Sequence, residues 1–236
     1  MNDAEECVVL ISGMLCTSRL WQGVVDSAPG RSVRCVVPSA CSIGEEVDEL
    51  LDSLTGPVAL VGFSLGANVA MAFADRAPER VARLVLISGN PRAPRPEQFA
   101  AWRTMQRRTR EGKLASVARN LLPSLLAADR RNDPALSALV EKMAHEVGSE
   151  QFLNQLSMQS SRVDQRGNLK RLSCPTLVIA AEADSMCPID ATAEIADAVP
   201  GAHWTTIPGA GHLSLLERPD LLRVAIAEWI EPPHKR

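Results

Sequence analysis

The sequence contains no tyrosine, and aromatic residues make up only 3% of its 236 residues. Any hydroxyl chemistry must therefore use serine, threonine or water. No apolar run approaches the roughly 18 residues that suggest a membrane span. The formal net charge is −3, without the basic excess that favours binding to a nucleic-acid backbone. These absences exclude a membrane span and argue against a nucleic-acid partner.

The cysteines are scattered, without a C-x-x-C pair or a nearby group of histidines. They are Cys7, Cys16, Cys35, Cys41, Cys174 and Cys187. The acidic start of the chain lacks the basic residues and long apolar segment of a secretory signal. We therefore expect a cytoplasmic protein with reduced, mostly buried thiols. Cys16 and Cys187 lie in loops and could instead line a pocket.

Short runs rich in apolar residues predict strands, and helical patterns separate them. The predicted strands are residues 7–12, 32–37, 57–62, 82–88, 176–181 and 203–207, and the predicted helices between and after them are residues 43–54, 65–76, 188–198 and 219–230. Most of the strands are apolar at successive residues, which is typical of strands covered on both faces of a parallel sheet. The pattern predicts an α/β fold of about six mostly parallel strands, with helices on both faces.

One long interval contains no convincing strand. Helical patterns occur there near residues 97–110, 114–122, 134–147 and 150–161. Because an insertion of this length is too long for a loop, we expect a helical cap at residues 94–169, inserted after the strand at 82–88. The core would then consist of residues 1–93 and 170–236. A basic run at residues 103–113 could bind an anion, but a solvated helix face is the more common explanation of such a run.

The segment Gly62-Phe63-Ser64-Leu65-Gly66 has the pattern G-x-S-x-G. In this pattern a serine lies on a tight strand-to-helix turn, and its small neighbours let the helix and strand approach each other. The pattern alone is weak evidence, since a chain of this length contains it by chance in roughly one case in twenty. A predicted strand precedes it and a predicted helix follows it. We therefore interpret Ser64 as a candidate nucleophile.

A serine nucleophile needs a base that accepts its proton and a third group that orients this base. His212 lies in a glycine-bounded loop after the last predicted strand, at the sheet edge where parallel sheets bind ligands. The other histidines lie in the helical insertion, at the start of a strand and in the terminal tail: His145, His203 and His234. Each of these is better explained as structural or solvated. His212 is therefore the candidate base.

The orienting carboxylate is expected in the loop after the strand at 176–181. Asp184 is the leading candidate, ahead of Glu182, which is nearer the strand, and Asp190, which lies in the next helix. An oxyanion would be stabilised by backbone amides. We assign one of them to Leu65 and the other to Met14, with Leu15 as the alternative to Met14.

These segments together resemble the α/β-hydrolase superfamily, in particular its small, cap-bearing bacterial serine esterases similar to pimeloyl-carrier-protein methyl ester esterases and related carboxylesterases. The resemblance covers nearly the whole chain through the segments ISGMLCTSRLW, VGFSLGANVAMAFADRAPERVARLVLIS, CPTLVIAAEADSMCP and PGAGHLSLLERP. The order Ser64, Asp184, His212 is also the order of that family.

The sequence departs from the family in two places. Ser12-Gly13 stands where many relatives have His-Gly, which leaves open how the oxyanion loop is anchored. The chain also begins at what resembles the third of the family's usual eight strands. We therefore expect the N-terminal antiparallel hairpin to be absent and the strand at 32–37 to form one edge of the sheet. A neighbouring molecule could cover that edge.

The resemblance implies hydrolysis of a small-molecule ester or thioester through an acyl-enzyme, without a metal or an organic cofactor. Residues that could line an apolar acyl pocket are Leu15, Phe63, Trp102 and Leu213, although core packing explains each of them equally well. The same triad could instead cleave carbon–carbon bonds, transfer acyl groups or support peroxide-dependent halide oxidation. A ligand-binding protein without catalysis is the alternative from another class. The oligomeric state stays open.

Overall fold

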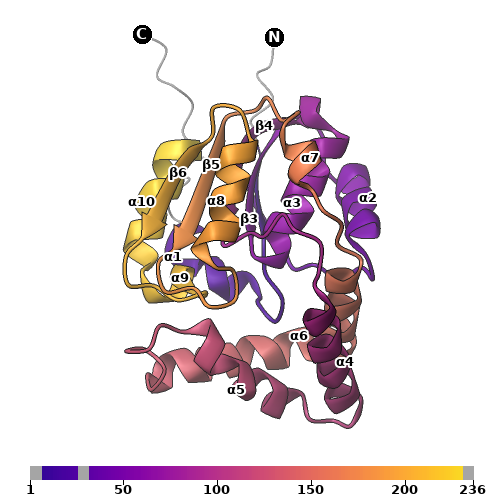
Figure 1. Cartoon of the computed structure of the whole chain (residues 1–236), viewed down its shortest axis with the longest axis vertical. Helices are drawn as coiled ribbons and strands as arrows, with labels where there is room; N and C mark the ends of the chain where they lie inside the picture. The colour runs from indigo at the N-terminus through magenta and orange to yellow at the C-terminus, as the bar shows by residue number, and fades with distance from the viewer. Residues whose placement is uncertain (1–6, 26–31, 231–236) are drawn as a thin grey trace.

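The computed structural model describes residues 7–25 and 32–230. Within these residues, six strands form one sheet in the order β2-β1-β3-β4-β5-β6 (Figure 1). The strands are β1 (Cys7–Ile11), β2 (Val33–Val36), β3 (Val58–Phe63), β4 (Val81–Ile87), β5 (Thr176–Ala181) and β6 (His203–Ile207). All neighbouring strands are parallel, so their carboxyl ends meet at one edge of the sheet. The predicted α/β fold is confirmed.

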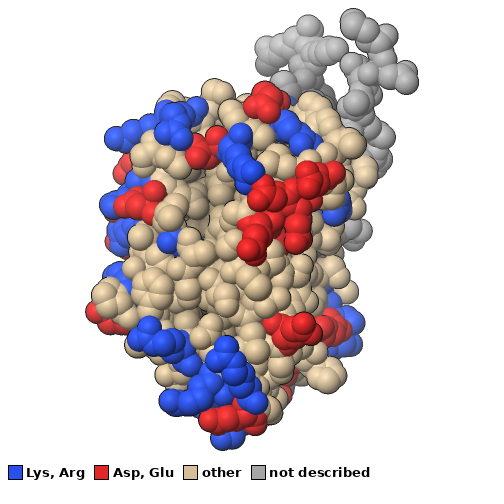
Figure 2. Space-filling view, turned by 90° about the vertical axis from the view of Figure 1, so that its right-hand side faces the viewer, with Lys and Arg blue, Asp and Glu red and all other residues tan. Residues whose placement is uncertain are grey.

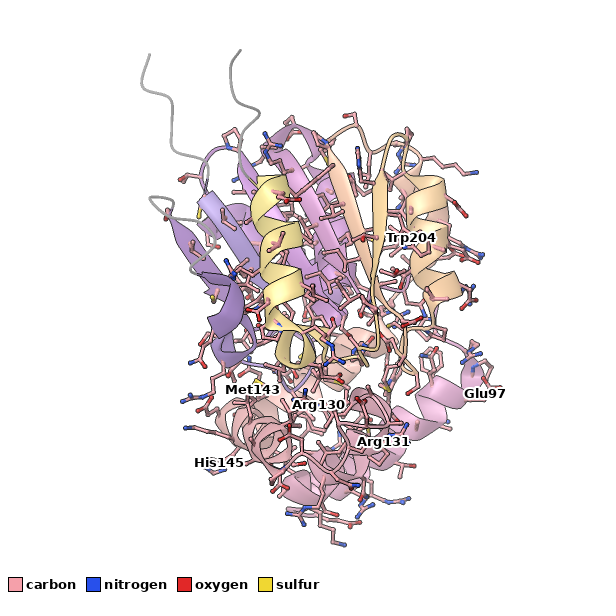
Figure 3. The ribbon with its side chains drawn as sticks, turned by 90° about the vertical axis from the view of Figure 1, so that its left-hand side faces the viewer. Glu97, Arg130, Arg131, Met143, His145 and Trp204 are labelled. Atoms are coloured by element: carbon pink, nitrogen blue, oxygen red, sulfur yellow. The ribbon has the colours of Figure 1, made fainter. Side chains whose placement is uncertain are left out.

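Burial separates the central strands from the edges. Every residue of β3 and of β5 is buried, as predicted from their continuous apolar sequences. β2 and β6 form the two edges and are partly exposed. Trp204 on β6, labelled in Figure 3, is 46% exposed. The strand predicted at residues 32–37 therefore does form an edge, and its cover by another molecule stays a prediction.

Helices cover both faces of the sheet. Successive residues of a strand point to opposite faces, and both sets are apolar, so each face needs a cover. On one face, Val8 belongs to a core cluster that includes Leu222 of α10 (Pro219–Ile230). On the other face, Val9 belongs to a cluster that includes Val47 of α2 (Ile43–Ser53). The other helices and turns of the core are η1 (Ser18–Trp21), α1 (Gln22–Val25), α3 (Leu65–Arg76), η2 (Pro78–Arg80), α7 (Arg166–Leu169), α8 (Ile189–Ala198) and α9 (Ser214–Glu217).

Three helices between β4 and β5 lie beside one end of the sheet (Figure 1). They are α4 (Pro96–Arg110), α5 (Leu114–Leu125) and α6 (Pro134–Ser160). The helices predicted at 134–147 and 150–161 are the two halves of α6, joined at Gly148, whose φ of 76° and ψ of 172° are not helical. We call α4, α5 and α6 the cap, and we propose that the cap and the core are separate domains. The expected boundary at residue 169 would place α7 in the cap, but Leu169 of α7 is buried in the same cluster as Val9 of β1, so α7 belongs with the core.

The basic run at residues 103–113 lies on α4 and in the turn that follows it. Arg107 and Lys113 are exposed, and both pair with Glu111. Figure 2 shows basic side chains gathered at one end of the molecule with acidic side chains among them. This arrangement favours the solvated helix face over an anion site. In the described residues, no helix is both long and apolar enough to cross a membrane.

Candidate active site

Ser64 lies on a strained turn between β3 and α3. Its φ is 53° and its ψ is −111°, backbone angles that residues other than glycine rarely adopt. The turn brings backbone segments very close together, since a Cβ added to Gly66 would lie 2.1 Å from the carbonyl oxygen of Ile11. A Cβ added to Gly62 would lie 2.5 Å from the carbonyl oxygen of Gly66. The glycines therefore allow the turn that exposes the serine.

The structure brings Ser64, His212 and Asp184 together from three separate loops. The Nε2 atom of His212 is 3.0 Å from the Oγ atom of Ser64, and its Nδ1 atom is 2.8 Å from Oδ2 of Asp184. His212 is only 4% exposed and Asp184 only 7%. With its proton on Nδ1, the imidazole donates to the carboxylate and can accept the serine proton at Nε2. This is the geometry that activates a serine hydroxyl.

The surroundings of Asp184 keep its carboxyl group ionised. Its Oδ1 atom accepts hydrogen bonds from the amides of Met186 and Cys187, both at 2.8 Å. Burial opposes ionisation, but the neighbouring His212 and these hydrogen bonds outweigh it, so the pKa of Asp184 is below its usual value. The ionised carboxylate fixes the imidazole in the orientation that faces the serine.

The two alternative acids have other partners. Glu182 accepts a hydrogen bond from the amide of Gly209 at 2.8 Å, and Asp190 forms an ion pair with Arg92. Of the other histidines, His145 is exposed on the cap and His203 begins the edge strand β6. His234 lies outside the described residues.

The loop that carries His212 is fixed by Glu217, which the sequence analysis did not identify. One carboxylate oxygen of Glu217 accepts the amide of Gly211 and the other accepts the amide of Ala127, each at 3.0 Å. The side chain is 4% exposed, and burial raises its pKa despite these two hydrogen bonds. Ala127 follows α5, so Glu217 connects the histidine loop to the cap.

The candidate oxyanion loop follows β1. Its Ser12 accepts a hydrogen bond from the indole Nε1 of Trp21 at 2.9 Å, so this serine anchors the loop at the position where many relatives have histidine. The amide of Leu15 donates to Oε1 of Gln155 at 3.0 Å and is not available to an oxyanion. In the described part of the chain, the amide of Met14 has no partner. Met14 is thus the better of the two predicted donors.

Leu65, the other predicted donor, is the first residue of α3. The first amides of a helix have no acceptor within the helix, and they point toward its N-terminal end. The helix dipole also favours negative charge at that end. The Leu65 amide is therefore suitable for a negative oxygen beside Ser64.

A narrow, largely apolar cavity that opens to solvent borders Ser64, and the space between its lining atoms, including the open solvent at its mouth, is about 510 Å³. It is lined by Met14, Leu15, Cys16, Phe63, Ser64, Leu121, Leu125, Val140, Met143, Gln159, Met186, His212 and Leu213. Three of the four predicted pocket residues are among them. The fourth, Trp102, instead packs in a buried cluster with Val117 and Phe152. Figure 3 shows Met143 on the side of the cap that faces the core, whereas His145 points away.

The cysteines are all free, and Cys16 borders the cavity while Cys187 does not. Burial raises the pKa of Cys16 to about 12 and also raises the pKa of Cys187. Within residues 7–25 and 32–230, no group of three or more histidine, cysteine or acidic side chains could hold a metal ion.

Sequence comparison finds relatives with hydrolytic activities. The chain is 29% identical over 170 residues to a pyrrolizixenacetamide deacetylase of Xenorhabdus hominickii, a match that covers 70% of this chain and 62% of that protein. It is 26% identical over 234 residues to a pimeloyl-[acyl-carrier protein] methyl ester esterase of Nitrosomonas europaea, covering 90% of this chain and 91% of that protein.

Comparison of structures also finds an esterase. A thermophilic esterase from Thermogutta terrifontis, solved with malate bound, superposes with a TM-score of 0.86 at 26% identity. The match covers 95% of this chain and 89% of the esterase. The model of the alpha/beta hydrolase family matches residues 8–225, which include every residue of the candidate site. The chain therefore belongs to the alpha/beta hydrolase family.

Proposed function

We propose that the protein hydrolyses a carboxylic ester or thioester of a small or medium acyl group through an acyl-enzyme. The main support for this proposal is the pair of hydrogen bonds that link Ser64 to His212 and His212 to Asp184. Hydrolysis of esters also agrees with the esterase-type relatives in sequence and structure.

The first half of the reaction forms the acyl-enzyme. Oγ of Ser64 attacks the carbonyl carbon while Nε2 of His212 takes the hydroxyl proton, and Asp184 stabilises the resulting imidazolium. The carbonyl oxygen becomes negative and accepts hydrogen bonds from the amides of Met14 and Leu65. Collapse of this intermediate breaks the bond to the alcohol or thiol, which leaves with the proton from His212.

The second half releases the acid. A water molecule gives a proton to Nε2 of His212 and attacks the acyl carbon, and the same two amides stabilise the second oxyanion. When this intermediate collapses, the bond to Oγ of Ser64 breaks and His212 returns the proton to the serine. The enzyme is restored without any oxidation or reduction.

The cavity supports an apolar acyl group. Its lining includes methionine, leucine, valine and phenylalanine side chains from the core and the cap. Burying apolar surface contributes roughly 25 cal/mol per Å². We therefore expect kcat/KM to rise as the acyl chain is extended until the chain fills the cavity. Kinetics with short esters, acyl thioesters and vinylogous diketones would separate ester hydrolysis from thioester and carbon–carbon bond cleavage.

The decisive test is Ser64→Ala. We expect this variant to lose turnover of p-nitrophenyl esters by at least about 10³-fold and to lose labelling by a fluorophosphonate probe, because it has no nucleophile. Ser53→Ala, an exposed serine at the end of α2, is the matched control and should keep both. A Ser64→Ala protein that is labelled and active like the control would refute the proposal.

A further inference from the structure

A buried amide side chain of the cap, that of Gln155 on α6, forms a hydrogen bond with the oxyanion loop. Gln155 is 0% exposed. Its Oε1 atom accepts the amide of Leu15 at 3.0 Å, and its Nε2 atom donates to the carbonyl of Pro38 at 3.0 Å. Because an amide N–H needs an acceptor and a carbonyl needs a donor, these two partners fix which end of the side chain faces the loop.

Leu15 adopts a backbone conformation that is unfavourable for leucine. Its φ is 59°, in the left-handed region that a branched side chain rarely occupies. Such a conformation persists only where the surroundings hold it. Here the cap supplies both restraints: Gln155 binds the Leu15 amide, and the Leu15 side chain is buried in a cluster with Trp102 and Phe152.

The restraint on Leu15 acts on the neighbouring residue as well. The peptide unit between Met14 and Leu15 is planar, so fixing the Leu15 amide also fixes the carbonyl of Met14 and limits the directions in which the Met14 amide can point. The loop already lies against the nucleophile, since a Cβ added to Gly13 would be 3.2 Å from the Cβ of Ser64. A small rotation at Leu15 would therefore misalign the Met14 amide.

We propose that Gln155 is a positioning residue for the oxyanion hole, so that docking of the cap and stabilisation of the transition state are coupled. The inference rests on the proposed function, because it assigns the Met14 amide to the oxyanion. Gln155 is not among the residues that line the cavity. It acts by holding Leu15, and through Leu15 it sets the orientation of the Met14 amide.

The same helix offers a matched control. Gln151 lies one turn before Gln155 and donates to the carbonyls of Val37 and Pro38 at 3.2 and 3.1 Å. It therefore attaches α6 to the same segment of the core, but neither of these hydrogen bonds reaches the oxyanion loop. Replacing either glutamine by methionine removes one side-chain amide from the same interface and keeps a side chain of similar length.

The test compares Gln155→Met with Gln151→Met in the full-length protein. For Gln155→Met we expect kcat for a p-nitrophenyl ester to fall about 10- to 100-fold with KM changed less than about twofold, since a misaligned oxyanion donor weakens transition-state binding. Affinity for a trifluoromethyl ketone, which forms an oxyanion with the serine, should fall by a similar factor. For Gln151→Met we expect a lower Tm with kcat within about threefold of the unmodified protein.

The conservative variant Gln155→Glu keeps the test conclusive if the methionine variant does not fold. Its carboxyl group still accepts the Leu15 amide and, when protonated, donates to the Pro38 carbonyl in place of the glutamine Nε2. We therefore expect kcat and ketone affinity to exceed those of Gln155→Met, or to stay within about tenfold of the unmodified protein. Equal losses of kcat in the Gln151 and Gln155 variants, with unchanged ketone affinity, would overturn the inference. Labelling of Ser64 in these variants tests the proposed function separately, because it requires the nucleophile and not the cap contact.

Discussion

Cys16 borders the cavity beside Ser64 but is chemically protected. Burial raises its pKa to about 12, so almost none of it is the reactive thiolate at pH 8. Cys41 is exposed. We predict that iodoacetamide at pH 8 modifies Cys41 in the native protein and spares Cys16, with no loss of esterase activity.

Mass spectrometry of the peptides checks this prediction, and the denatured protein, in which both cysteines should be modified, is the control. Modification of Cys16 in the native protein, with parallel loss of activity, would show that this thiol is accessible and reactive.

The three residues of the proposed triad could be identified as candidates from the sequence because each follows a strand in a recognisable local pattern. The strand, the turn with Ser64 and the helix after it are adjacent in sequence, and the loops of Asp184 and His212 follow β5 and β6. Glu217 and Gln155 could not be predicted in this way. Their contacts between the core and the cap, from Glu217 to Ala127 and from Gln155 to Leu15, join residues 90 and 140 positions apart, and no local pattern records such contacts.

At the scale of elements, the closeness of α3 to β1 depends on Gly66. Since an added Cβ would lie 2.1 Å from the carbonyl oxygen of Ile11, Gly66→Ala must push the helix away from the strand. We predict a lower Tm and a kcat reduced by at least about tenfold, because the shift moves Ser64 and the Leu65 amide together.

Gly44→Ala on α2 is the control, since nothing lies within 4 Å of a Cβ at that position. Alanine is the better helix former, so this variant should be as stable as the unmodified protein or more stable. Thermal unfolding and steady-state kinetics of both variants provide the measurement. If Gly66→Ala had the same Tm and the same kcat as Gly44→Ala, the close approach of α3 to β1 at Gly66 would not determine stability or activity.

The strands and the longer helices were predicted to within a few residues, because apolar patterns and glycines mark them. The short elements η1, α1, η2, α7 and α9 were not predicted. In the cap, the two helices predicted at 134–147 and 150–161 do occur, on either side of the non-helical Gly148 in α6. The direction of individual side chains was less predictable. Trp102 was predicted to line the pocket, but it packs against α5 and α6 instead. Apolar residues on a cap helix can face the cavity or a neighbouring helix, and periodicity alone does not distinguish the two.

At the scale of the whole molecule, Glu217 joins the core to the cap. Burial raises its pKa in the folded protein above the value of about 4.3 in an unfolded chain. The folded state thus binds a proton more tightly than the unfolded state. The contribution of this proton to stability is fully present below the unfolded pKa and is lost as the pH rises through the folded pKa.

We therefore predict that Glu217→Gln, which cannot titrate, is less stable than the unmodified protein at pH 4.5 and that this difference narrows by pH 7.5. Urea unfolding at the two pH values measures it. A difference that widened with pH would mean that the pKa of Glu217 is lowered on folding, not raised.

The kink at Gly148 divides α6 into two parts, and substitutions in the two parts should have different consequences for the enzyme. Before the kink, Val140 and Met143 border the cavity, while after it Gln155 accepts the Leu15 amide and Gln159 also borders the cavity. A library confined to Val140 and Met143 could therefore exchange one acyl selectivity for another while keeping the contact between Gln155 and Leu15. Changes around Gln155 would instead act on every substrate alike.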